Sequence, residues 1–198
     1  MKKLLGWSGV VGGLLWGLKP IYDMSIHNRR WGQGYEPTHF LDYIAFLFPL
    51  LCIGGLIVIY GFYKKAVRNS IIFLIVAVIL NAGFTFSETY FYGSGLPFGL
   101  IFMLTGLLST MIGTIYFVLQ LKRASDSNLL LSGGAITLFL VNFLLVAFGF
   151  LSDVFPKDLV DFISETLFVS VGFIWSLFGA SALILTNKNA SNRKYLAL

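Results

Sequence analysis

The polar side chains with the clearest helical spacing in this chain lie inside or beside long apolar segments. Asn81, Thr85 and Glu88 follow one another at intervals of four and three residues, which places them on one helical face. Asp161 and Glu165 share a face near the start of the last apolar segment. Polar side chains in such segments often line solute or ion pathways. We therefore predict a polar pocket suited to a cation, an amine or a proton-coupled solute, lined by Asn81, Thr85, Glu88, Asn142, Asp161 and Glu165.

The same residues also have a purely structural interpretation. Asn and Thr side chains inside a helical bundle can hydrogen-bond between helices, at about 0.6 kcal/mol each. Acidic side chains in the first turn of a helix, such as Asp158, are favoured by the helix dipole. The spacing of the residues leaves both interpretations open.

Both histidines lie in the polar stretch HNRRWGQGYEPTHFLDY, residues 27–43. Within it, Glu36, His39 and Asp42 recur every three residues and could converge on a helix. A zinc site needs more ligands and supporting hydrogen bonds, and the two histidines show no HxxxH or HExxH spacing. We expect no metal and no cofactor. The stretch is interpreted as an interfacial lid over the outer mouth of the pocket.

Sequence patterns of known catalytic sites are absent. There is no GxSxG motif, and neither histidine lies inside an apolar segment, so a serine nucleophile within the membrane would lack a base. Cys52 is the single cysteine, which excludes an intrachain disulfide and a CxxC redox pair. Glu88 and Glu165 could in principle act as acid and base. We nevertheless expect a protein that is not an enzyme.

Six apolar segments must position these residues. Of the 198 residues, 57% are hydrophobic and 12% are charged, which is about half the charge of a soluble domain. A helix needs roughly 20 residues to cross a membrane. The chain is therefore predicted to be one all-α bundle of six transmembrane helices spanning residues 1–198. The predicted parts are helices at 4–22, 40–63, 70–89, 97–121, 129–151 and 159–186, an outer interfacial loop at 23–39 and a tail at 187–198.

Lys and Arg are distributed unevenly between the two sides of this bundle. Ten of the 14 lie on the side of the termini and of the loops at 64–69 and 122–128. Because cytoplasmic loops are enriched in Lys and Arg, we expect both termini in the cytoplasm and a bacterial cytoplasmic membrane as the location. The formal charge of +5 then reflects a basic cytoplasmic rim suited to anionic lipids. It does not indicate nucleic-acid binding.

Small residues indicate how the helices pack. Gly9, Gly13 and Gly17 lie at intervals of four on one face of the first helix, and such faces allow close backbone contact in lipid. This face could pack within the bundle, or could dock a partner membrane protein or a second copy. We expect the segment to be a retained helix, without a signal-peptide cleavage site, and Lys19 to reach the interface at its far end. Pro49 predicts a kink in the second helix.

Two functions stay open from the sequence. The first is a non-enzymatic multi-pass membrane protein that binds or transports a small cationic or polar solute through an outward-facing pocket. The second is a structural or regulatory membrane subunit that acts by helix–helix contact with a partner. Ligand binding that depends on the pocket carboxylates would favour the first function. Loss of a partner after substitution of Gly9 or Gly13 would favour the second.

Overall fold

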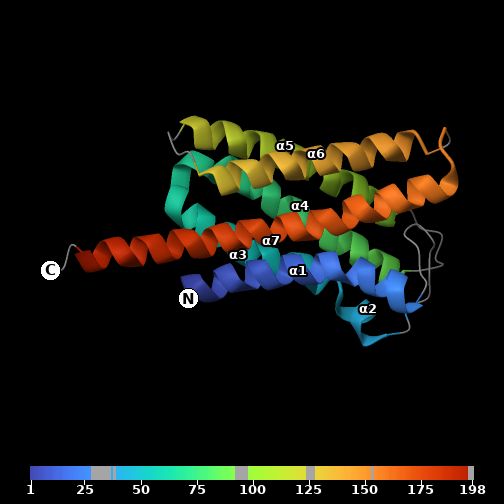
Figure 1. Cartoon of the computed structure of the whole chain (residues 1–198), viewed down its shortest axis with the longest axis horizontal. Coiled ribbons are helices and arrows are strands. Elements are labelled where there is room, and N and C mark those ends of the chain that lie inside the picture. Colours follow the sequence, from blue (N-terminus) through green and yellow to red (C-terminus); the bar gives the residue numbers. More distant parts are fainter. Residues whose placement is uncertain (28–36, 38, 92–97, 124–127, 153, 196–198) are drawn as a thin grey trace.

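The computed structural model is helical throughout the part of the chain that it describes. It describes residues 1–27, 37, 39–91, 98–123, 128–152 and 154–195, with the backbone alone for residues 26–27 and 189–195. Figure 1 shows the long helices lying side by side. In chain order, the elements are α1 (Lys2–His27), α2 (Phe40–Ile44), α3 (Leu47–Tyr63), the 3-10 helix η1 (Lys64–Val67), α4 (Arg68–Tyr90), α5 (Phe98–Arg123), α6 (Leu129–Phe150) and α7 (Lys157–Tyr195).

Five stretches of helix among the described residues are long and apolar enough to cross a membrane. They are Lys2–Ser25, Leu47–Tyr90, Phe98–Arg123, Leu129–Phe150 and Lys157–Lys188. The sequence predicts six spans, and the difference lies in Leu47–Tyr90, which contains both α3 and α4. Large apolar side chains cover the outside of the helices, for example Trp7 at 58% and Phe143 at 50% exposure. The helices and this surface are compatible with a multi-pass membrane protein.

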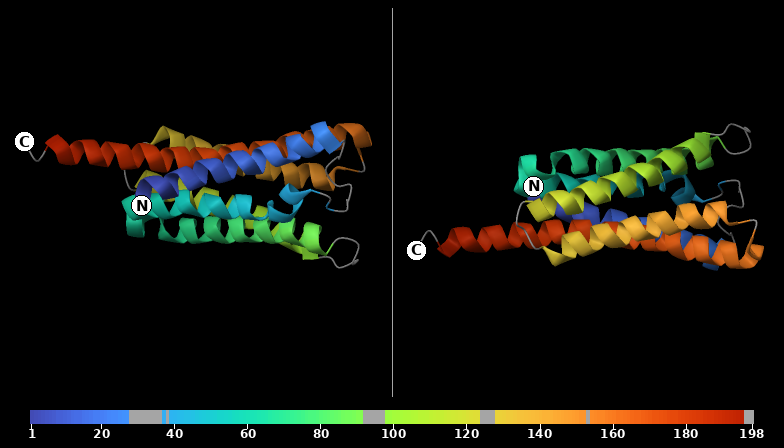
Figure 2. Two further views of the ribbon diagram at one scale, coloured as in Figure 1. Left: turned by 90° about the horizontal axis from the view of Figure 1, so that it is seen from below. Right: turned by 90° about the horizontal axis from the view of Figure 1, so that it is seen from above.

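The helices form a ring with one helix outside it. Each of α3, α4, α5, α6 and α7 contacts the next, α7 returns to contact α3, and α1 packs against α3 and α7. In Figure 2, α1 runs along α7 in the view from below, and α4, α5, α6 and α7 follow one another in the view from above. The interior is one continuous hydrophobic core that includes Leu74, Phe117, Leu138, Trp175 and Phe178.

The closest backbone approach joins α1 to α7. A Cβ atom on Gly13 would lie 2.7 Å from the carbonyl oxygen of Gly172, and one on Gly9 would lie 3.0 Å from Cα of Gly179. A Cβ atom on Gly172 would in turn overlap the backbone of Gly17. Larger residues would force the two helices apart. The glycine face of α1 therefore packs within the chain, and a partner protein could contact it only by displacing α7.

Two helices are longer than the sequence predicts. α1 continues through Pro20, so residues 23–27 are helical where a loop is expected. α7 includes residues 187–195, where a tail is expected. In all three views of Figures 1 and 2, the last turns of α7 extend beyond the bundle. The apolar pattern predicts only the part of each helix that would cross the lipid. The helical structure of α1 and α7 continues beyond that part into polar residues.

Pro49 explains why the helix predicted at 40–63 is divided into α2 and α3. A proline lacks the N–H that would bond to the carbonyl four residues earlier, and that carbonyl belongs to Ala45. The N–H of Phe48 bonds to this oxygen instead, at 3.1 Å. The helix is interrupted at Ala45 and Phe46, so the kink predicted from Pro49 lies one turn before it.

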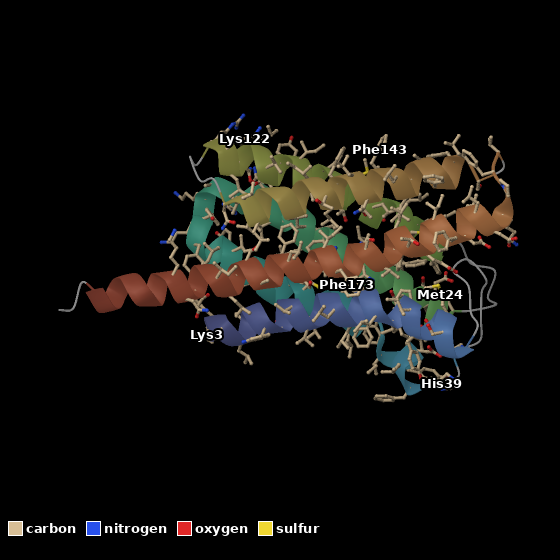
Figure 3. All side chains as sticks on the ribbon, in the orientation of Figure 1. Lys3, Met24, His39, Lys122, Phe143 and Phe173 are labelled. Carbon is tan, nitrogen blue, oxygen red and sulfur yellow. The ribbon has the colours of Figure 1, made fainter. Side chains whose placement is uncertain are left out.

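The two ends of the bundle carry different charges. Both termini, η1, the C-terminal end of α5 and the start of α6 lie at one end, the η1 end, and α2 marks the other, the α2 end (Figure 1). Figure 3 shows Lys3 and Lys122 at the η1 end, with Met24 and His39 at the α2 end. Described charged side chains toward the η1 end are basic, namely Lys2, Lys3, Lys64, Lys65, Arg68, Lys122, Arg123 and Lys188. Described acidic side chains lie toward the α2 end, namely Asp23, Asp42, Glu88, Asp158, Asp161 and Glu165.

We predict that Gly13→Ala destabilises the bundle, because the new Cβ would overlap the backbone of Ser176 on α7. Overpacking of this kind costs about 1–3 kcal/mol. Gly133→Ala is the matched control, since a Cβ atom there meets nothing within 4 Å. Thermal unfolding of the purified proteins in one detergent should give a lower Tm for Gly13→Ala alone. Equal Tm values for the two variants would contradict the close α1–α7 contact.

Candidate functional site

Asn81 lies on the interior face of α4 and is 5% exposed. Its Nδ2 donates to the carbonyl oxygen of Ala77 at 2.8 Å, the one side-chain hydrogen bond of Asn81 among the described residues. Opposite it on α5 is Gly106, where a Cβ atom would lie 3.0 Å from the same Nδ2. Thr85, one turn further along α4, donates to the carbonyl oxygen of Asn81 at 3.2 Å. Both side chains therefore bond to carbonyl oxygens within α4.

Asn142 occupies the equivalent place on α6. It is 1% exposed, and its Nδ2 donates to the carbonyl oxygen of Leu138 at 2.7 Å. Within the described part of the chain this is its single side-chain hydrogen bond. Asn142 therefore bonds back to a carbonyl oxygen of its own helix, like Asn81.

Ring contacts fix the height of Asn81 in the bundle. The rings of Phe84 on α4 and Phe168 on α7 meet edge to face, with centroids 6.4 Å apart. The two helices run in opposite directions, and Asn81 lies three residues before Phe84. At a rise of about 1.5 Å per residue, this contact puts Asn81 near Val171. The contact of Asn81 with Gly106, together with the Phe117–Phe178 contact, puts it near residue 167.

The contact between α6 and α7 places Asn142 at a similar height. A Cβ atom on Gly134 would lie 4.0 Å from Cε2 of Phe178. Asn142 is eight residues beyond Gly134, and these helices also run in opposite directions. Because Gly134 also lies beside Cβ of Leu177, at 3.9 Å, Asn142 is level with about residues 169–170 of α7. The two predicted asparagines are therefore within about one helical turn of each other along the bundle.

Trp175, nearer the η1 end on α7, carries a further buried polar group. It is 1% exposed, and its Nε1 is buried with no hydrogen-bond partner among the described residues. Its indole stacks on Trp16, with centroids 6.4 Å apart, and lies 5.4 Å from the ring of Phe178. The indole therefore packs between Trp16 of α1 and Phe178 of its own helix. We call Asn81, Asn142 and Trp175 the polar layer.

The predicted carboxylates lie nearer the α2 end and differ in their surroundings. Glu165 is 8% exposed on α7, three residues before Phe168, and Asp161 is half-buried one turn earlier. Glu88 is exposed near the end of α4, and its carboxylate packs over Gly99 of α5, where a Cβ atom would lie 3.4 Å from Cδ. Glu165 is therefore the carboxylate of this set that the fold buries.

Sequence reasoning misses some of the buried polar residues. Thr110 and Thr114 of α5 are 1% and 0% exposed, and each bonds to a carbonyl oxygen of its own helix at 2.8 Å. Thr110 lies four residues after Gly106, and Thr114 directly follows Gly113. These positions beside glycines are the signal in the sequence that could have identified the two threonines as buried. Trp175 gives no such signal, because the sequence does not distinguish a tryptophan with an unpaired N–H from any other apolar residue of the core.

Lys19 forms an ion-pair cluster at the α2 end, and its predicted approach to the interface stays a prediction. Its Nζ bonds to both carboxylate oxygens of Asp23, at 2.7 and 2.6 Å, and to Oδ1 of Asp42 at 2.8 Å. The three side chains are 10%, 13% and 1% exposed. Oδ2 of Asp42 accepts a hydrogen bond from the backbone N–H of His39 at 3.1 Å. This Lys19 cluster joins the end of α1 to α2, so Asp42 is part of an ion-pair network.

The polar stretch at residues 27–43 is described only in part. Among the described residues, no group of three or more His, Cys, Asp and Glu is placed to hold a metal ion. The side chain of His27, residues 28–36 and residue 38 lie outside the described residues. Most of the predicted lid therefore lies outside them too.

Comparisons with known proteins give no family for this chain. No protein-family model, no curated protein and no solved structure matches it. The basis for a functional assignment is therefore the arrangement of its own side chains.

We predict that Lys19→Met strongly destabilises the protein, because it leaves Asp23 and Asp42 buried without their ammonium partner. Removal of one member of a buried ion pair costs about 3–5 kcal/mol. Lys157→Met, at an exposed position at the start of α7, is the matched control and should leave the Tm almost unchanged. If both variants unfold at the same temperature in a thermal scan, the Lys19 cluster does not stabilise the fold.

Proposed function

We propose that this protein is a non-enzymatic integral membrane protein with six spans, which binds or transports a small polar or cationic solute. The solute enters a pocket at the α2 end, which faces outward. Both termini lie in the cytoplasm, and the membrane is a bacterial cytoplasmic membrane. The residues proposed to line the pocket are Asn81, Thr85, Glu88, Asn142, Asp161 and Glu165.

The charges at the two ends support this orientation. The charged side chains described toward the η1 end are basic. Lys and Arg are retained on the cytoplasmic side of membranes. The same basic rim would attract anionic lipid headgroups. Counting α3 and α4 as separate spans gives six, since η1 lies between them and the view from below in Figure 2 shows them side by side. An even number of spans puts both termini on one side.

The burial of Glu165 is the observation that carries the solute-binding proposal. A carboxylate inside a membrane bundle is costly and is generally retained for a function. Glu165 lies on the inner side of α7, with Asp161 one turn closer to the α2 end. The two carboxylates make a route along α7 that attracts cations, and it leads from the outer end toward the polar layer.

The alternative function, a structural or regulatory subunit that acts by helix contact, has less support. The face that would dock a partner contains Gly9, Gly13 and Gly17, and α7 covers it. A partner or a second copy would have to use the lipid-facing surface instead.

We predict that Glu165→Gln removes ligand-induced stabilisation without unfolding the protein. Small amines, monovalent cations, amides and polyols are added to the purified protein, and its Tm is measured. A ligand at 100 times its Kd adds about 2.7 kcal/mol to the free energy of unfolding, and the cationic ligands should lose this effect in Glu165→Gln. Asp158→Asn, at an exposed carboxylate on the same helix, is the control.

Two results would count against this site. If no member of the panel stabilises the unaltered protein, the proposal of solute binding is wrong. If Glu165→Gln is stabilised as strongly as Asp158→Asn, the solute binds elsewhere.

We predict that an impermeant maleimide labels the α2 end from outside intact cells. Single cysteines replace Val154, which is 72% exposed, and Lys65, which is exposed in η1, in a Cys52→Ala background. Labelling at position 154 and protection at position 65 are expected from the basic η1 end. Labelling at position 65 with protection at position 154 would invert the topology and place the pocket on the cytoplasmic side.

A further inference from the structure

The short helix α2 is bonded to a neighbouring helix on each of its two sides. On the side of α1, Nζ of Lys19 donates to Oδ1 of Asp42 at 2.8 Å. On the side of α4, the hydroxyl of Thr89 donates to the backbone carbonyl oxygen of Asp42 at 3.3 Å. The hydroxyl of Tyr90 donates to the backbone carbonyl oxygen of Tyr43 at 3.1 Å. In the view from below in Figure 2, α2 lies between α1 and α4, so it joins these two helices at the α2 end of the bundle.

The joint between α2 and α3 has the features of a hinge. The helix is interrupted at Ala45 and Phe46, because Pro49 cannot donate to the carbonyl oxygen of Ala45. Hinges in proteins are a few residues at the ends of elements, which absorb the change in backbone angles when a segment moves. α2 can therefore pivot as a unit at this joint, and its bonds to α1 and α4 hold it in place.

The Lys19 cluster lies at the height of Glu165. Gly172 of α7 packs against the backbone of Gly17 on α1, and the two helices run in opposite directions. Asp23, six residues after Gly17, is therefore level with about residue 166 of α7. Glu165 lies seven residues before Gly172, which places it on the same face of α7. The cluster and this carboxylate thus lie at one height, where α1 packs against α7.

The ion pair is the strongest of the described bonds that hold α2. The side chains of Lys19 and Asp42 are 10% and 1% exposed, whereas Tyr90 is 48% exposed. Hydrogen bonds between charged groups are roughly twice as strong as those between neutral groups. A buried carboxylate that loses its cation is costly unless another cation replaces it. A competing cation could therefore open this pair, and an uncharged solute could not.

We infer that α2 is the outer gate of the Glu165 site, and that the ion pair between Lys19 and Asp42 is the latch that holds it closed. The inference rests on the proposed function and identifies its solute as a cation. A cation at the α2 end competes with Lys19 for the carboxylates of the cluster. Loss of the ion pair leaves α2 held by its weaker bonds to α4, and α2 then pivots away from α1 and opens the way to Glu165.

The test measures how often α2 opens, from the labelling rate of a cysteine at position 45. Ala45 is at the C-terminal end of α2 and is 6% exposed, so a water-soluble maleimide should reach a cysteine there only when α2 moves. Ala45→Cys is made in a Cys52→Ala background, and the protein is labelled in lipid nanodiscs. Asp42→Asn should raise the rate about tenfold, the effect of losing one hydrogen bond between charged groups. Asp158→Asn, at an exposed carboxylate on α7, is the control and should leave the rate unchanged.

A milder pair of variants decides the inference if Asp42→Asn fails to fold. Tyr90→Phe removes one hydrogen bond to α2 and keeps the ring, so it should raise the labelling rate about fivefold. Tyr116→Phe is the matched control, since Tyr116 lies on α5 and is 49% exposed, against 48% for Tyr90. Equal labelling rates in the two tyrosine variants would overturn the gate.

Methylammonium tests whether a cation opens the latch, because it is the charged end of a lysine side chain. It should raise the labelling rate at position 45 saturably in the protein with Asp42 intact. Acetamide, of similar size but uncharged, should leave the rate unchanged. Glu165→Gln should weaken the response to methylammonium, since it removes one carboxylate from the site. A rate that methylammonium leaves unchanged, or that both compounds raise equally, would overturn the assignment of the latch.

Two outcomes separate this inference from the proposed function. If neither Asp42→Asn nor Tyr90→Phe speeds labelling, the gate is rejected, and stabilisation by amines that depends on Glu165 leaves the proposed function standing. If the variants speed labelling but no member of the ligand panel stabilises the protein, solute binding is rejected, and with it the role of α2 as the gate for a solute.

Discussion

Lipid offers no hydrogen bonds, so polar side chains within the membrane must be enclosed by other helices. This constraint accounts for the ring of α3 to α7. The outer surface carries apolar side chains such as Phe143, which points away from the bundle in Figure 3. The amides of Asn81 and Asn142, the indole N–H of Trp175 and the carboxylate of Glu165 are buried inside it. The enclosed positions are therefore where a function can be sought.

Two different interactions hold α1 against this ring. At Gly9, Gly13 and Gly17, α1 presents no side chain to α7, and the backbones approach closely. Near the α2 end, the Lys19 cluster joins α1 to α2 by buried ion pairs. The first interaction depends on shape and the second on charge. Together they fix α7, and with it Glu165 and Trp175, relative to the rest of the ring.

The sequence predicts the helices well because lipid imposes both length and apolar composition on them. It also identifies Asn81 and Asn142, since an amide in an apolar run is conspicuous. Trp175 is missed because its N–H becomes significant only when the packing leaves it unpaired. The pairing of Lys19 with Asp42 is missed because it joins residues far apart in sequence. The ends of α1 and α7 are misjudged because helical structure continues beyond the apolar pattern that marks them.

An experimental density map of the protein in lipid nanodiscs, at a resolution that shows ordered small molecules, would test the central claim most directly. The account predicts density that belongs to no protein atom beside the carboxylate of Glu165. It would be contradicted if this carboxylate contacted other side chains alone, with no such density beside it. In that case, the buried polar residues would serve only to hold the helices together.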